Sequence, residues 1–124
     1  EAVVLHGYLQ KAGMPFGALL INRVRPAYLT PEELDGLQAR LLKAAQELQG
    51  GSALSAAQAK AASERVARAC EDYAVLSEVD ASRVAEVTQR LGADAEHLWT
   101  VPLFDGDVHD IPSLAAFADH VFAD

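Results

Sequence analysis

Hydrophobic residues recur at helical spacing from the first residues of the chain. Ala2, Leu5, Leu9 and Ala12 follow steps of three and four, and Gly13 is a residue type that commonly ends a helix. No Ser, Thr, Asp or Asn stands before Ala2 as a cap. We therefore expect a first helix that ends at about Gly13, and a chain that is a piece of a longer protein.

Two short apolar stretches predict strands. Residues 16–22 are almost continuously apolar and do not alternate, which is typical of a parallel strand that is covered by helices on both faces. Residues 98–103 predict a second strand, with Pro102 at its end or at an edge, since proline has no backbone donor. Because two strands do not make a stable sheet alone, we expect further strands outside this chain, or dimerisation.

The segment between these strands has a helical pattern. Thr30-Pro31-Glu32-Glu33 is a typical helix start, with a Thr cap, Pro at the first position and Glu at the third. One face of the predicted helix carries Leu34, Leu37, Leu41, Ala45 and Leu48, and residues 49–52 (QGGS) are expected to end it. A second helical stretch covers about 55–91, with a possible break and new cap at residues 80–82. Its predicted apolar stripe is Val66, Ala69, Tyr73, Leu76, Val84, Val87 and Leu91.

The C-terminal segment predicts a loop and a last helix. After residues 104–110, Asp110 is a candidate cap and Pro112 lies in the first turn. The apolar face of this helix would consist of Leu114, Phe117, Ala118 and Val121. The chain is thus expected to be α/β, dominated by helices, with two short strands.

Composition excludes some classes of function. The 124 residues carry a formal net charge of -8, which disfavours binding to nucleic acids and to anionic membranes. The single cysteine, Cys70, allows no internal disulfide and favours a reducing compartment, so we expect a cytoplasmic protein. No apolar run approaches the roughly 20 residues of a membrane span.

Few side chains suggest chemistry. Asp105, Asp107, His109 and Asp110 are dense in potential metal ligands, but a solvated turn with a helix cap explains them better, and we predict no metal site. No residue has the pattern of a catalytic nucleophile or an acid–base pair, and Cys70 fits a small buried hydrophobe.

Two motifs in this order resemble one family. GMPFGALLINRV (residues 13–24) and VPLFDGDVHDIPSL (residues 101–114) look like the C-terminal half of the arsenite-pump (ArsA-like) ATPases and of their relatives that target tail-anchored membrane proteins. The resemblance implies a P-loop NTPase fold with a mostly parallel sheet. Residues 1–30 and 93–124 would form the C-terminal edge of that α/β domain, and residues 31–92 a helical insertion that docks clients or partners.

The resemblance also implies a site. Asn22 matches the asparagine that hydrogen-bonds adenine, and an amide offers the donor and the acceptor that an adenine edge requires. The loop against the base would be formed by Pro102, Leu103, Phe104, Asp105 and Asp107. Phe104 would stack on the base or belong to the core. From their position after Asn22, and not from the resemblance, Arg23 and Arg25 are expected to contact phosphate or a partner, or to be plain surface charges.

Further implications concern the whole protein. It would bind ATP and Mg²⁺, act as a homodimer, and serve a membrane-protein client or a membrane subunit. This chain contains no GxxxxGK[ST] loop and no CxxC pair, so the missing N-terminal part would supply catalysis and the zinc-bridged dimer is not expected. Alone, the chain is predicted to be inactive.

Two other hypotheses stay open. The alanine-rich helices between Thr30 and Leu91 are compatible with a helical protein-interaction module that binds no nucleotide. A degenerate regulatory subunit that binds ATP without hydrolysing it is the other alternative.

Overall fold

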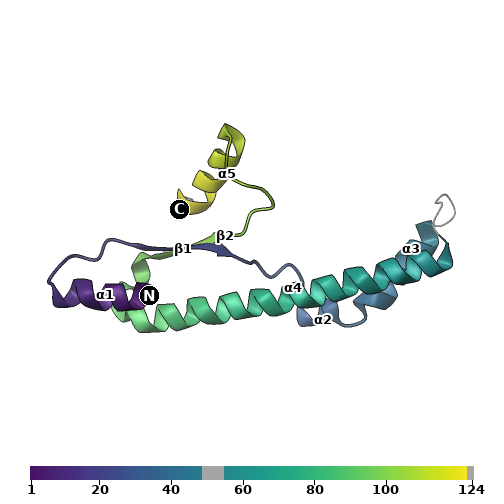
Figure 1. Ribbon diagram of the computed structural model, residues 1–124, viewed down its shortest axis with the longest axis horizontal. Coiled ribbons are helices and arrows are strands. Elements are labelled where there is room, and N and C mark those ends of the chain that lie inside the picture. The colour runs from purple at the N-terminus through teal and green to yellow at the C-terminus, as the bar shows by residue number, and fades with distance from the viewer. Residues whose placement is uncertain (49–54, 123–124) are drawn as a thin grey trace. The chain divides into compact units, whose positions relative to one another are not determined.

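The chain is a mixed α/β structure that is mostly helical. The computed structural model describes residues 1–48 and 55–122. Its helices are α1 (Ala2–Lys11), α2 (Pro31–Leu34), α3 (Leu37–Leu48), α4 (Ala56–Leu91), the 3-10 helix η1 (Gly92–His97) and α5 (Ile111–Phe122). Its strands are β1 (Leu19–Val24) and β2 (Leu98–Pro102) (Figure 1). Residues 1–26 with 79–124 form one compact unit and residues 27–78 form a second, so α4 contributes to both. The expected division at residues 30/31 and 92/93 stays a prediction.

The two strands of the first unit pair in parallel, as the sequence predicted. Leu19 lies opposite Leu98, Leu20 opposite Trp99 and Ile21 opposite Thr100. In Figure 1, α5 lies on one side of this strand pair, and α1 with the last turns of α4 lies on the other. The parallel pairing places the carboxyl ends of both strands at the same end of the sheet.

The expected cover on both faces of the strands is incomplete. Val101 is only 1% exposed, but Leu20 and Trp99 are 46% and 43% exposed. Since side chains alternate between faces, these three residues share one face of the sheet. Helix α5 packs against β2, yet Leu20 and Trp99 stay exposed. The prediction of full burial was therefore wrong for the middle of the strands.

Helix α1 ends as its glycine predicts. Gly13 has φ = 66°, which glycine adopts without the steric cost of a Cβ. The N–H groups of Gly13 and Met14 donate to the carbonyls of Gln10 and Leu9, which satisfies two of the last carbonyls of the helix.

One histidine links α1 to η1, and the sequence did not single it out. His6 is 5% exposed, and its Nε2 lies 2.7 Å from Oδ2 of Asp94. Gln10 donates to the same oxygen at 3.1 Å, and the edge of the His6 ring meets Phe16 with centroids 4.8 Å apart. The spacing of His6 and Gln10, one turn apart on α1, is the only sequence signal of this contact.

The second unit begins with the predicted capping box. The Glu33 N–H donates to Thr30 Oγ1, and the Thr30 N–H donates to Glu33 Oε2. The expected single helix is instead divided, because Gly36 at φ = 67° separates α2 from α3. The predicted helix end at residues 49–52 lies outside the described residues.

Helix α4 is continuous, so the possible break at residues 80–82 does not occur. Its covered positions in the second unit are small residues, with Ala59, Ser63, Ala67 and Ser77 at most 4% exposed. The predicted stripe was wrong for Val66 and Leu76, which are 48% and 46% exposed. Its member Tyr73 is half-buried and stacks on Tyr28, with ring centroids 5.5 Å apart. In the first unit, Val84 and Val87 are half-buried and Leu91 is buried, as predicted. None of the described helices is both long and apolar enough to span a membrane.

We predict that the link between α1 and η1 weakens in acid. The hydrogen bond from His6 is the largest influence that lowers the pKa of the Asp94 carboxyl below its usual 3.8. The pKa of this carboxyl is lower in the folded chain than in the unfolded one. The stabilisation is therefore fully present above the unfolded pKa, and it is lost as the pH falls through the folded pKa.

The measurement is the free energy of unfolding of the wild type and of Asp94→Asn, from about pH 6 down to about pH 2. The difference between them should shrink at the acid end. Glu71→Gln, an exposed change on α4, serves as the control and should stay close to wild type. A difference that is constant with pH would contradict the prediction.

Candidate functional site

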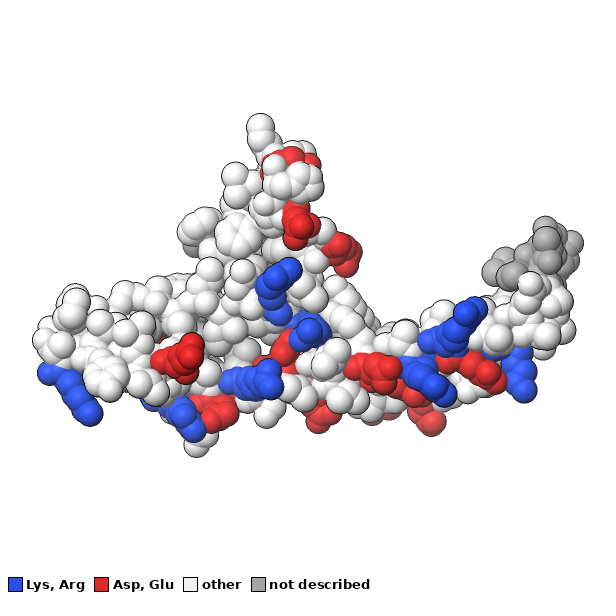
Figure 2. All heavy atoms as spheres, viewed as in Figure 1, with Lys and Arg blue, Asp and Glu red and all other residues white. Residues whose placement is uncertain are grey.

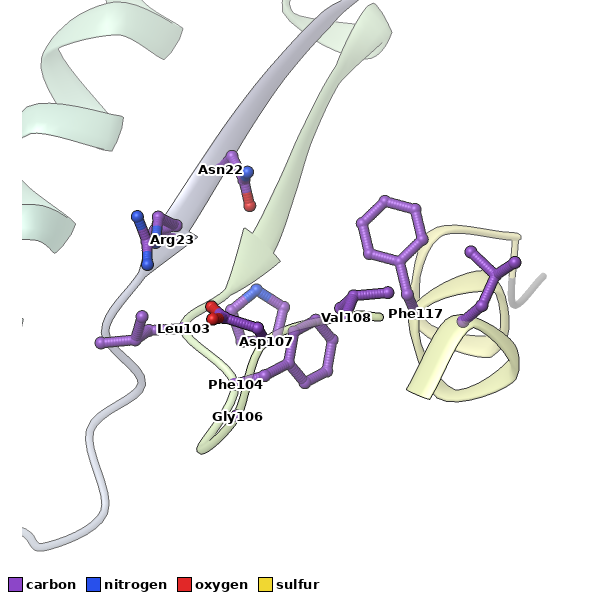
Figure 3. A pocket seen from close by; sticks show the side chains of 10 residues that line it. Asn22, Arg23, Leu103, Phe104, Gly106, Asp107, Val108 and Phe117 are labelled. Atoms are coloured by element: carbon purple, nitrogen blue, oxygen red, sulfur yellow. The ribbon is translucent and has the colours of Figure 1, made fainter. Parts of the chain in front are cut away.

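A cavity of about 440 Å³ lies at the carboxyl ends of β1 and β2, in the first unit. Three elements contribute to it: the end of β1, the loop that follows β2, and α5 (Figure 3). The lining residues are Asn22, Arg23, Pro102, Leu103, Phe104, Gly106, Asp107, Val108, Leu114 and Phe117. The carboxyl end of parallel strands is where α/β folds bind ligands.

The end of β1 is irregular. The strand register shifts between Ile21 and Val24, so Asn22 and Arg23 leave the regular ladder. Arg23 has φ = 63°, and it is the non-glycine residue with positive φ in the described chain. A side chain in this left-handed conformation costs roughly 1 kcal/mol or more. Such bulges redirect side chains, and strained backbone of this kind clusters at functional sites.

The bulge gives the two side chains different directions. In Figure 3, Asn22 and Arg23 leave β1 on opposite sides, and Asn22 is on the side of the loop and Phe117. The Asn22 amide has no hydrogen-bond partner among residues 1–48 and 55–122. It is therefore a free donor and acceptor at the cavity.

The loop after β2 forms the floor. Pro102 ends β2, as its missing donor predicts, and the N–H of Leu103 donates to the Val24 carbonyl at 2.8 Å. This hydrogen bond holds the start of the loop against the end of β1. The Phe104 ring lies 6.5 Å from the Phe117 ring, at an interplanar angle of 55°.

The cap of α5 closes the loop. The N–H of Ser113 donates to Asp110 Oδ1 at 2.8 Å, so Asp110 is the cap that the sequence predicted. The hydrogen bonds from Ser113 lower the pKa of the Asp110 carboxyl. The Nδ1 of His109 lies 2.7 Å from the Asp107 carbonyl. Among the described residues, no group of three or more His, Cys, Asp or Glu side chains is placed to hold a metal ion.

The structure brings most of the predicted site residues together. Asn22, Arg23, Pro102, Leu103, Phe104 and Asp107 all line the cavity, although about 80 residues separate the two groups in sequence. Asp105 is exposed in the loop and is not part of the lining. Arg25 lies outside the lining too, and its side chain pairs with Asp80 of α4 at 2.8 Å. The contribution of Gly106, Val108, Leu114 and Phe117 was not predicted, although Leu114 and Phe117 belong to the predicted apolar face of the last helix.

Charge limits the ligands that suit this cavity. From Leu98 onward the chain has no Lys or Arg, whereas Asp105, Asp107 and Asp110 surround the loop. On the face seen in Figure 2, acidic side chains gather in the upper part of the molecule, while acidic and basic side chains mix over the rest. Arg23 is the only cationic side chain in the lining. The cavity therefore suits a flat, uncharged group better than a polyanion.

No protein-family model, curated protein or solved structure matches this chain.

We predict that Arg23→Gly stabilises the fold by about 0.5–1 kcal/mol, because glycine adopts φ = 63° without the clash of a Cβ. Arg23→Val should destabilise it by roughly 1–2 kcal/mol, since a β-branched residue is least tolerant of positive φ. Urea unfolding of the three chains gives the measurement. Equal stability of the Gly and Val variants would show that position 23 is not in the left-handed conformation.

Proposed function

We propose that the cavity at the ends of β1 and β2 binds the adenine base of a nucleotide. The observation that carries this proposal is the convergence of the free Asn22 amide with the Phe104 and Phe117 rings at one opening. Ligand pockets of this kind are mostly apolar and contain a few polar groups that fix the orientation of the ligand. An amide offers one donor and one acceptor to the edge of adenine.

The chemistry of the lining supports a base more than a phosphate chain. Apolar side chains from the loop and from α5 suit the faces of an aromatic ring. Asp107 disfavours an anion, and Arg23 points away from Asn22 in Figure 3. The phosphates would therefore extend from the cavity toward groups that this chain does not contain. Asp105 and Arg25 take no part in base binding in this proposal.

The wider proposal is that this chain is the C-terminal part of an arsenite-pump-like ATPase with a P-loop NTPase fold. Support comes from the two motifs at residues 13–24 and 101–114 and from the parallel pairing of their strands. The whole protein would bind Mg²⁺ and ATP in the cytoplasm and hydrolyse ATP through a phosphate loop outside this chain. It would form a homodimer and serve a membrane-protein client or membrane subunit.

Asn22→Ala should weaken the binding of adenosine by about tenfold, on the scale of a lost hydrogen bond in a partly enclosed site. Titration of the chain with adenosine, followed by NMR, provides the affinity. Thr100→Ala is the matched control, because Thr100 is an exposed strand residue outside the lining, and it should leave the affinity unchanged. Equal adenosine affinity of the wild type and Asn22→Ala would show that Asn22 does not contact the ligand.

The isolated chain should release no phosphate from Mg-ATP above background, because it contains no GxxxxGK[ST] loop to hold the phosphates. A phosphate-release assay at high protein concentration tests this expectation. Phosphate release that scales with the concentration of the chain would contradict it.

A second candidate function has its own observation. Helix α4 exposes Val66, Val75 and Leu76, at 48%, 60% and 46%, in the unit formed by residues 27–78. Val66 and Leu76 lie on adjacent sides of this helix and Val75 lies opposite Val66, so a protein-interaction surface here would use Val66 and Leu76. If the chain is a helical interaction module that binds no nucleotide, the double variant Val66→Ser, Leu76→Ser should lose partner binding. Adenosine should then not bind to the wild type.

A further inference from the structure

The backbone beyond the bulge of β1 is held by one carboxylate of α4. Arg25 directs two donors to Oδ2 of Asp80: its backbone N–H at 3.2 Å and its guanidinium Nη1 at 2.8 Å. The Asp80 side chain is 16% exposed. The contact joins residues 55 positions apart, and both belong to the first unit.

This contact lies next to the strained residue. Arg23 is in the left-handed conformation, Val24 accepts the hydrogen bond from the Leu103 N–H, and Arg25 is the residue anchored to Asp80. The two hydrogen bonds thus fix the chain directly after Arg23. An arginine stays in the left-handed conformation only where contacts with the surrounding structure hold its backbone in place.

We propose that Asp80 is a positioning residue for the cavity: its contact with Arg25 holds Arg23 in the left-handed conformation and thereby aims the Asn22 amide at the ligand. Asp80 itself is not among the lining residues, so it acts through the backbone and touches no ligand. The proposal rests on the proposed function for its ligand, but the backbone arrangement that it explains is independent of any ligand.

Charge is part of the contact. The backbone hydrogen bond from Arg25 is the largest influence that lowers the pKa of the Asp80 carboxyl, and burial opposes it. The positive charges of Arg25 and Arg83 act in the same direction as the hydrogen bond. Asp80 therefore stays ionised at neutral pH, and hydrogen bonds to a charged acceptor are stronger than neutral ones.

The test compares Asp80→Ala with Glu78→Ala, a change at an exposed acid two residues away on α4. The first readout needs no ligand: the NMR signals of the Asn22 side-chain amide and of the backbone of residues 22–25. Asp80→Ala should move these signals and remove the left-handed signature of Arg23, while Glu78→Ala leaves them in place. Unchanged signals in folded Asp80→Ala would overturn the proposal.

The second readout is adenosine affinity, which Asp80→Ala should lower by about three- to tenfold, on the scale of one impaired neutral hydrogen bond between Asn22 and the ligand. If adenosine does not bind the wild type, the proposed function fails while the ligand-free NMR readout still decides the role of Asp80. If adenosine binds Asp80→Ala and the wild type equally, Asp80 does not position Asn22.

Two further variants cover the case in which Asp80→Ala does not fold. Asp80→Asn keeps an oxygen that accepts from the Arg25 N–H but loses the charge. The NMR signals of residues 22–25 in this variant should therefore lie between those of the wild type and those of a chain that has lost the contact. Arg23→Gly favours the left-handed backbone by itself, so Asp80→Asn should move the Asn22 amide signal less in that background. An equal shift in both backgrounds would contradict coupling between Asp80 and position 23.

Discussion

The parallel pairing of β1 with β2 is the interaction on which the rest of the site depends. It joins the first strand of the chain to a strand about 80 residues later and brings their carboxyl ends to one place. Without this pairing, Asn22 and the loop of residues 102–108 would have no reason to meet. The last hydrogen bond of the pair, from the Leu103 N–H to the Val24 carbonyl, is also the one that seats the loop.

The irregular end of β1 makes the side chains of Asn22 and Arg23 available to the cavity. A regular strand would continue the ladder through Asn22 and Arg23, whereas the bulge frees both residues. The conformation at Arg23 is unfavourable for an arginine, so the contacts around it must stabilise it. Asp80 of α4 supplies one of these contacts, which makes the long helix part of the support of the cavity.

Local signals predicted the element boundaries well where a cap or a glycine fixes them. Thr30 with Glu33, Asp110 with Ser113, and Gly13 act as their residue types indicate, because caps depend on neighbours in sequence. The buried face of α4 was harder to predict. Two sets of residues with the same helical spacing run along this helix, one of small side chains and one of larger apolar side chains. In the second unit the small side chains are covered, whereas Val66 and Leu76 of the other set are exposed.

For the cavity too, local sequence motifs indicated some residues, while contacts between distant residues could not be predicted. The strand end and the loop were identified from their motifs, and the pairing of the strands brings six of the predicted residues to the cavity lining. Because Arg25 follows the end of the strand, it was expected to contact phosphate or a partner, or to be a surface charge. Its partner, Asp80, is distant in sequence and lies on a helix that showed no sign of the contact. Long-range ion pairs of this kind depend on the tertiary structure and leave no local pattern.

The adenine base should bind between Asn22 and the loop after β2. An NMR titration of the labelled chain with adenosine, and with guanosine in parallel, is the decisive measurement. Adenosine should cause saturable shifts that are confined to the cavity lining and include the Asn22 side-chain amide. Guanosine should cause weaker shifts, because its edge has a different order of donors and acceptors. No saturable shift with adenosine, or shifts confined to the exposed face of α4, would show that adenine does not bind at this site.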